Sequence, residues 1–121
     1  CHTHRSLSSS FKVLDLTVTM STDMSKRLYD AARKGDFQAV KAALENGADI
    51  NWGNPNDEGR TPLWIASHEG RELVIKKLLA SGADINKANN RGHTPLWVAN
   101  NWGKGDNEAV VDILKEAGGR E

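Results

Sequence analysis

The strongest constraint on the fold of this chain is that its sequence repeats itself. Residues 47–51 read Gly-Ala-Asp-Ile-Asn, and the same five residues return at positions 82–86, a shift of 35. Residues 59–66 (Gly-Arg-Thr-Pro-Leu-Trp-Ile-Ala) return as Gly-His-Thr-Pro-Leu-Trp-Val-Ala at positions 92–99, a shift of 33. A period of this size is typical of an array of stacked units, in which each unit buries its apolar face only against its neighbours.

Each unit is predicted to contain two short helices. In the two clearest units a threonine followed by a proline, Thr61-Pro62 and Thr94-Pro95, marks the start of the first helix. The threonine side chain is suited to cap the helix N-terminus, and proline fits the first helical position because no amide donor is needed there. We expect the first helices to end near Gly70 and Gly103, with the second helix following directly.

The second helix has its clearest pattern in the middle unit. Leu73, Val74, Leu78 and Leu79 recur at helical spacing, which predicts an apolar stripe that faces the core. Gly82 comes shortly after the last of them and is expected to terminate the helix as a C-cap.

The first and last units depart from this pattern and are interpreted as caps. The first unit lacks the Thr-Pro start, but the spacing of its glycines, 35–47, equals the spacing 70–82 in the middle unit. In the last unit the spacing is longer, 103–118, which predicts a longer loop around residues 104–107 and a final helix over residues 108–117. That helix is predicted to bury Ala109, Val110, Ile113 and Leu114 and to expose Asp112, Lys115 and Glu116.

The order of turn, helix, tight turn, helix and Gly-Ala-Asp hairpin resembles the ankyrin repeat, whose pattern includes a Thr-Pro-Leu-His helix start and a Gly-Ala-Asp hairpin. The resemblance covers about residues 25–121. It implies an all-α fold, an ankyrin-repeat solenoid of stacked helix-turn-helix units joined by β-hairpin-like loops, over residues 24–121. The three repeats are expected at about residues 25–55, 56–88 and 89–121.

Residues 1–23 differ from the rest of the chain and are interpreted as a leader. They are rich in serine and threonine and carry no helical apolar stripe, so we expect them to be disordered. The alternation of apolar and polar residues over 14–20 would also suit an edge strand, and the serine-rich start resembles a transit peptide. Cys1, His2 and His4 lie close together, but a structural zinc site needs four ligands, so we expect a chance grouping.

Charge and composition exclude several classes of function. Sixteen basic residues balance sixteen acidic ones, so the net charge does not favour nucleic acid or an anionic membrane as a partner. No apolar run approaches the roughly 20 residues needed to cross a bilayer. The single cysteine fits a reducing compartment, the cytoplasm or the nucleus.

The resemblance implies that the repeats bind another protein in a concave groove lined by hairpin tips and by the exposed side of each first helix. Carried over position by position, the groove residues are Arg33, Lys34, Asp57, Glu58, Arg60, His68, Glu69, Asn90, Arg91, His93 and Asn101. Trp102 falls on the outward side of its helix and Trp52 opens an inserted loop, so both are added as contact candidates. Trp64 and Trp97 replace the family's histidine and are expected to pack between neighbouring repeats.

Catalysis is not predicted. Ser67, His68 and Glu69 are adjacent in one helix, where consecutive side chains point in different directions and cannot form a relay. His68 and His93 lack a matching set of metal ligands and are expected to be solvent-exposed polar residues, with no metal and no cofactor. We therefore expect a monomeric, non-catalytic protein-binding module. The alternative is a structural terminal segment of a larger multidomain ankyrin protein.

Overall fold

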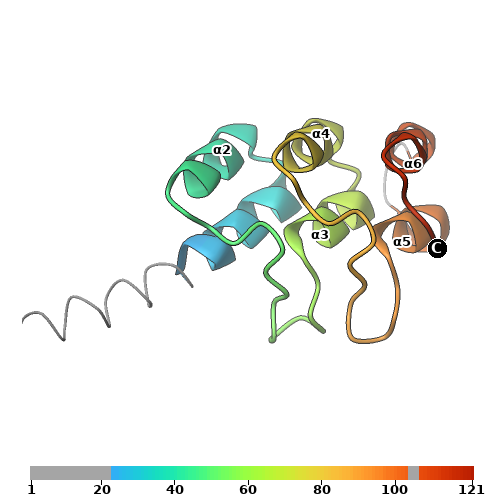
Figure 1. Ribbon diagram of the computed structural model, residues 1–121, viewed down its shortest axis with the longest axis horizontal. Helices are drawn as coiled ribbons and strands as arrows, with labels where there is room; N and C mark the ends of the chain where they lie inside the picture. The colour runs from blue at the N-terminus through green and yellow to red at the C-terminus, as the bar shows by residue number, and fades with distance from the viewer. Residues whose placement is uncertain (1–22, 104–106) are drawn as a thin grey trace, which may run out of the picture.

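Helices stacked in pairs make up the part of the chain that the computed structural model describes, residues 23–103 and 107–121. An N-terminal helix covers residues 23–34. The later helices are α2 (Phe37–Glu45), α3 (Pro62–Glu69), α4 (Glu72–Ala80), α5 (Pro95–Trp102) and α6 (Asn107–Glu116). Figure 1 shows two layers, with the N-terminal helix, α3 and α5 in one and α2, α4 and α6 in the other. The all-α repeat fold predicted from the sequence is confirmed.

The helix starts follow the local chemistry of the sequence. The Thr61 side chain accepts a hydrogen bond from the Trp64 amide at 3.1 Å, and the Thr94 side chain accepts one from the Trp97 amide at 3.2 Å. A proline follows each threonine at the first helical position. The two first helices end directly before Gly70 and Gly103, as the sequence predicts.

The apolar stripe of α4 is shifted from its predicted position. Val74, Ile75 and Leu78 are buried, whereas Leu73 is 67% exposed. The predicted stripe and the observed one both fit a helical period, so periodicity alone could not separate them. α4 packs against α2, α3 and α6, and Val74, Ile75 and Leu78 belong to the shared core whereas Leu73 does not.

The last helix agrees more closely with its pattern. Val110 and Leu114 are fully buried, and Ala109 and Ile113 are partly buried. The predicted outward residues, Asp112, Lys115 and Glu116, are exposed. Most of the predicted longer loop, residues 104–106, lies outside the described residues.

One aromatic side chain in each of the first two repeats is hydrogen-bonded to the repeat that follows. The Tyr29 hydroxyl donates to the Asp57 carboxylate, and Trp64 Nε1 donates to the carbonyl oxygen of His93 at 3.0 Å. Trp64 is fully buried and Trp97, at the equivalent position of the third repeat, is partly buried. Trp64 thus packs between repeats, as predicted, and joins the second repeat to the third.

A second set of bonds links the Gly-Ala-Asp segments. The Asn51 side-chain oxygen accepts a hydrogen bond from the Asp84 amide at 2.8 Å, and the Asn86 side-chain oxygen accepts one from the Arg120 amide at 2.8 Å. The asparagine that ends each Gly-Ala-Asp-Ile-Asn segment therefore accepts a bond from the third residue of the corresponding segment in the next unit, Asp84 or Arg120.

The predicted leader lies outside the described residues except for Asp23, which is helical. This also applies to the proposed edge strand at residues 14–20 and to the grouping of Cys1, His2 and His4. Among the helices that the structure describes, none combines the length and the apolar character needed to cross a bilayer.

The asparagine bonds predict a measurable coupling between repeats. We expect Asn51→Ala to lower the free energy of unfolding by about 1 kcal/mol, because it removes the acceptor for the Asp84 amide. For a domain of this size that loss corresponds to a fall in Tm of about 4–8 °C, measured by circular dichroism. Asn56→Ala is the matched control in the same loop, since Asn56 is exposed. Equal Tm values for the two variants would show that the Asn51 bond contributes nothing.

The chain has a single tyrosine, so the ionisation of Tyr29 can be followed by absorbance. Burial first, and then the hydrogen bond to the Asp57 carboxylate and its charge, raise the pKa of Tyr29 well above its usual value, about 10. The folded protein keeps this proton at pH values where the unfolded chain releases it. The free energy of unfolding should therefore fall as the pH rises above about 10.

We expect the phenolate absorbance of the native protein to rise only together with the loss of helical circular dichroism. In the chain unfolded by urea, Tyr29 should ionise at its usual pH of about 10, within about one pH unit. Tyr29→Phe should make the alkaline loss of stability less steep. Ionisation near pH 10 in a chain that is still helical would contradict the buried Tyr29–Asp57 contact.

Candidate protein-binding surface

Two hairpins project from the layer that holds the first helices (Figure 1). In the first hairpin the Asn54 amide donates to the Arg60 carbonyl at 2.9 Å, and the Gly59 amide donates to the Asn54 carbonyl at 2.8 Å. Glu58 has a φ of 59°, so it occupies the left-handed region that non-glycine residues rarely adopt. The tip of this hairpin is therefore a defined turn.

Each hairpin is built around a buried asparagine that the sequence analysis missed. The Asn89 side-chain oxygen accepts hydrogen bonds from the amides of Arg91 at 3.1 Å and His93 at 3.0 Å. The Asn54 side-chain oxygen accepts one from the Asn56 amide at 3.0 Å. Asn54 and Asn89 are 9% and 6% exposed. They are separated by the repeat shift of 35, a signal in the sequence that could have identified them.

The tips of the two hairpins are joined to each other. The Glu58 carbonyl accepts a hydrogen bond from the Asn90 amide at 2.7 Å. The Glu58 carboxylate lies 2.8 Å from the Arg91 guanidinium and 3.3 Å from that of Arg60, which also contacts Asp57 at 3.2 Å. We call Asp57, Glu58, Arg60, Asn90 and Arg91 the tip network. It brings together five of the predicted contact residues and holds both hairpins in one surface.

Next to the second hairpin, three aromatic side chains of the third repeat pack on one another. The rings of His93 and Trp97 are stacked with their centroids 3.8 Å apart and an interplanar angle of 6°. Trp102 stands edge-on to both, with centroids 4.7 Å from Trp97 and 5.1 Å from His93. Trp102 is 43% exposed. We call these three residues the aromatic cluster.

The second repeat carries a related arrangement with a cation in place of His93. The Arg60 guanidinium lies 4.3 Å from the centroid of the Trp64 ring, and the His68 ring stacks on the same indole at 5.7 Å. The prediction that His68 and His93 are solvent-exposed is wrong, because both are only partly exposed. Their positions beside Trp64 and Trp97 let each imidazole cover an indole.

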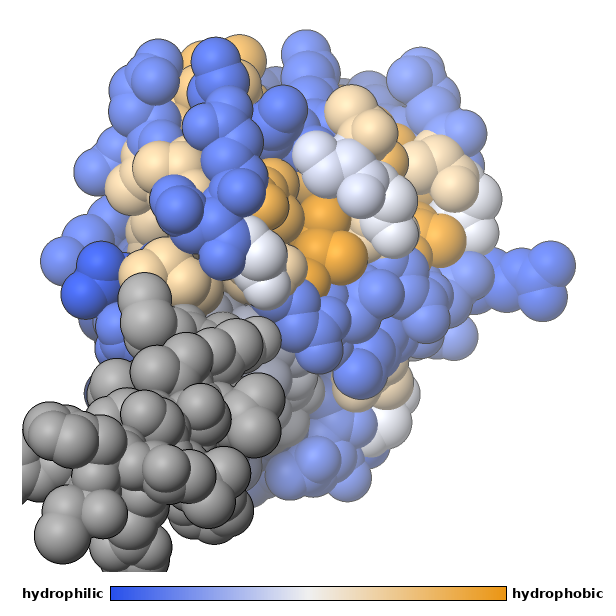
Figure 2. Space-filling view, turned by 60° about the vertical axis from the view of Figure 1, so that its left-hand side comes forward, coloured by the Kyte–Doolittle hydropathy of each residue, from blue (hydrophilic) through white to orange (hydrophobic). Residues whose placement is uncertain are grey.

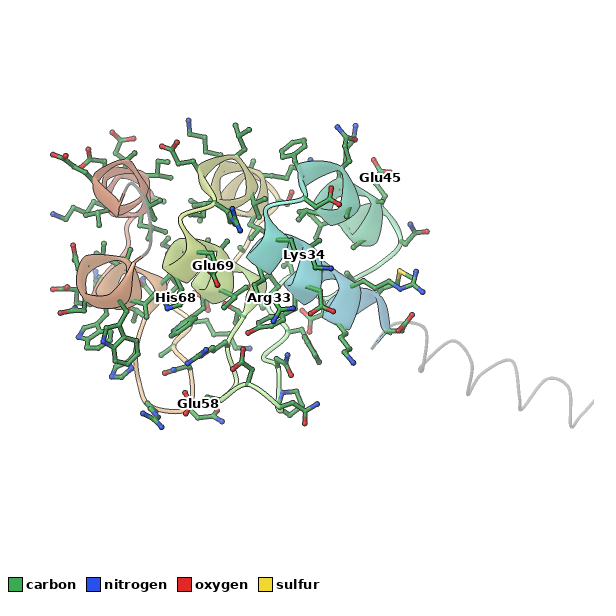
Figure 3. The ribbon with its side chains drawn as sticks, turned by 180° about the vertical axis from the view of Figure 1, so that it is seen from behind. Arg33, Lys34, Glu45, Glu58, His68 and Glu69 are labelled. Carbon is green, nitrogen blue, oxygen red and sulfur yellow. The ribbon has the colours of Figure 1, made fainter. Side chains whose placement is uncertain are left out.

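The remaining predicted contact residues are more scattered. Figure 3 shows Arg33 and Lys34 on the N-terminal helix, and His68 and Glu69 on α3. Arg33 lies 3.8 Å from Asp30, and Glu69 lies 3.8 Å from His68. On α5, the exposed Asn101 donates from its side chain to the Trp97 carbonyl at 2.8 Å.

Trp52 lies apart from these groups and packs inward. It stands edge-on to Tyr29, with ring centroids 6.3 Å apart, and is partly buried against the core. A partner could therefore reach less of Trp52 than of Trp102.

The N-terminal end of the array carries a separate hollow of about 480 Å³. It lies between the N-terminal helix and α2, and Figure 2 shows apolar side chains among hydrophilic ones on this side of the molecule. Its lining includes Ala31, Ala39, Ala43 and Lys34. Lys34, predicted as a groove residue, thus also lines this end of the stack.

The neighbouring residues Ser67, His68 and Glu69 do not form a relay from the serine hydroxyl to the imidazole. Ser67 is buried and donates its hydroxyl proton to the Leu63 carbonyl oxygen at 2.7 Å, one helical turn back. Its proton is thus not directed at His68. Across the described ranges, His, Cys, Asp and Glu side chains form no group of three or more that could hold a metal ion.

Comparison with known proteins agrees with this architecture. The chain is 46% identical over 61 residues to human "Arf-GAP with coiled-coil, ANK repeat and PH domain-containing protein 3", a match covering 50% of this chain and 7% of that protein. It is 39% identical over 56 residues to "Ankyrin repeat domain-containing protein oryK" of Aspergillus oryzae, covering 46% of this chain and 9% of the relative. Human "ARF GTPase-activating protein GIT2" is 37% identical over 62 residues, a match that covers 51% of this chain and 8% of that protein.

These matched segments are small parts of much longer relatives, so the activities named for those proteins belong to the whole proteins. The match to a protein family covers a larger part of this chain than the matches to these relatives do. The family described as "Ankyrin repeats (3 copies)" matches residues 28–120, which include α2 to α6, both hairpins and the N-terminal helix from residue 28 onward. This chain therefore belongs to the ankyrin-repeat family.

Proposed function

We propose that this chain is a non-catalytic interaction module that binds a partner protein through its hairpin tips and the exposed side of its first helices. Ankyrin repeats in general bind other proteins, and this supports the class of function. The observation that carries the proposal is the tip network. Five of the thirteen predicted contact residues are joined there across two hairpins, including Glu58 and Arg91 at 2.8 Å.

A surface held in one arrangement before binding loses little conformational entropy when a partner docks. The Asn90 amide bond to the Glu58 carbonyl, at 2.7 Å, fixes the backbone of one tip against the other. Arg91 remains exposed over 63% of its side chain, so a partner can reach it although it is paired. Because both charge signs are present, the network favours recognition by complementary charge over bulk attraction.

Such a module would serve as an adaptor, in the cytoplasm or the nucleus, where the single cysteine would stay reduced. The second candidate is a structural terminal segment of a larger multidomain ankyrin protein. The short coverage of the relatives, 7% to 9% of their lengths, favours that alternative.

The test uses the full chain as bait in an extract of the source organism, beside a tip variant, Asn90→Ala with Arg91→Ala. The matched control is Gln38→Ala with Lys41→Ala, which also removes one amide and one cation at exposed positions, here on α2 in the opposite layer. We expect the recovered partner to bind the tip variant with a Kd at least about tenfold higher than that of the unsubstituted chain. Its Kd for the control variant should be unchanged, and both are measured by interferometry.

Equal binding by the tip variant and the control variant would place the site elsewhere on the molecule. Recovery of no partner by the unsubstituted chain would favour the structural alternative. Circular dichroism of both variants provides the check that they are folded.

A further inference from the structure

The segment that ends α2 joins an asparagine directly to a glycine. Asn46 is the C-cap residue of α2, and Gly47 follows it. Every other asparagine of the sequence precedes a larger residue. Because glycine has no Cβ, its backbone nitrogen can approach the carbonyl carbon of the preceding asparagine side chain. An Asn-Gly pair is therefore the dipeptide in which asparagine deamidates most readily.

Both residues of this pair are open to solvent. Asn46 and Gly47 are exposed, and a Cβ placed on Gly47 would meet no atom within 4 Å other than those of its chain neighbours. The corresponding pair of the second repeat, Ser81 and Gly82, is exposed as well, although a complete repeat packs before it. Exposure at this position is thus a property of the repeat, and the junction has room for a five-membered ring.

The hydrogen bonds at this helix end determine when a reaction between the two residues can occur. Asn46 Nδ2 donates to the Ala42 carbonyl at 2.7 Å, and the Gly47 amide donates to the Leu44 carbonyl at 3.2 Å. Both nitrogens are therefore held while the last turn of α2 is closed. Helix ends open locally at a lower free energy than the whole domain unfolds. The reaction is thus expected from the opened last turn.

We propose that Asn46 is a site of spontaneous deamidation and that its product weakens the contact between the first and second repeats. The Gly47 nitrogen loses its proton and attacks Cγ of Asn46. A C–N bond forms and closes a succinimide ring, while the Cγ–Nδ2 bond breaks and ammonia leaves. Water then opens the ring at one of its two carbonyl carbons, which leaves aspartate or isoaspartate at position 46. The reaction needs only water and makes no use of the proposed binding surface.

The product disturbs the end of α2 through its charge. A carboxylate replaces the group that donates to the Ala42 carbonyl, and a carboxylate can only accept. It also lies at the negative end of the helix dipole, where α2 has no basic side chain in its last turn to offset it.

Isoaspartate disturbs the chain further, because it adds a methylene to the backbone directly before the Gly-Ala-Asp-Ile-Asn segment. In that segment the Asp49 amide donates to the Ser25 hydroxyl oxygen at 2.9 Å. The Asn51 side-chain oxygen accepts from the Asp84 amide of the second repeat at 2.8 Å. A displacement of residues 47–51 therefore reaches the contact between the two repeats.

The test ages the full chain in mildly alkaline buffer below its Tm and locates the products by mass spectrometry of its peptides. Isoaspartate is counted by enzymatic methylation, and a second sample is aged in urea. Asn46→Ser is the matched control, since it supplies the residue that the second repeat has at this position, Ser81, and cannot form the ring. Asn46→Asp supplies the carboxylate without the added methylene.

We expect Asn46 to deamidate faster than any other asparagine of the folded chain, and faster still in urea, with isoaspartate among the products. The Tm of the aged chain should fall by about 4–8 °C, the shift expected from losing one interaction at a helix end. The fall should be smaller for Asn46→Asp, and the Tm of the aged Asn46→Ser chain should not change.

Two kinds of result would overturn the proposal. An intact Asn46 in a folded chain whose other exposed asparagines, such as Asn56, have deamidated would show that this is not the reactive site. Deamidation at Asn46 with an unchanged Tm, or an equal fall in Tm for the aged Asn46→Ser chain, would show that the product does not weaken the contact between the repeats.

Discussion

The contact of Trp64 with the third repeat is the interaction on which the rest of the structure depends. The Trp64 side chain is fully buried, its N–H donates to the His93 carbonyl at 3.0 Å, and the Arg60 guanidinium lies over its ring. One repeat cannot bury its own apolar face, so the stability of the array depends on such contacts between units. Trp64 combines apolar area, a hydrogen bond and a cation–π contact at one of these junctions.

The positions of the surface residues follow from that junction. His93 is fixed through its carbonyl by Trp64 and through its amide by Asn89. The second hairpin is therefore held at its base, and the bond from the Asn90 amide to Glu58 holds its tip. A partner meeting this face would encounter two hairpins that the core has already arranged.

Much of the fold could be predicted because its signals are local and repeated. The Thr-Pro starts, the glycine ends and the burial of Trp64 follow from capping chemistry and from position within the period. The side of α4 that faces the core could not, because Leu73 and Ile75 both fit a helical stripe. The partial burial of His68 and His93 depends on rings that neighbouring residues provide.

The tip network was predicted only as separate surface residues. Nothing local indicates that Glu58 bridges Arg60 and Arg91, because that contact joins two hairpins through their tertiary placement. The burial of Asn54 and Asn89 has a signal in the sequence, because the two asparagines are separated by the repeat shift of 35 although they lie outside the longest repeated segments.

The most direct test of this account is the hydrogen exchange of the four indole N–H groups, followed by NMR. If Trp64 joins the repeats as described, its N–H should exchange as slowly as the most protected core amides of α3 and α4, at the rate set by global unfolding. The N–H of Trp102 should exchange within the first spectrum. Rapid exchange of the Trp64 N–H in the folded protein would contradict the central role assigned to this contact.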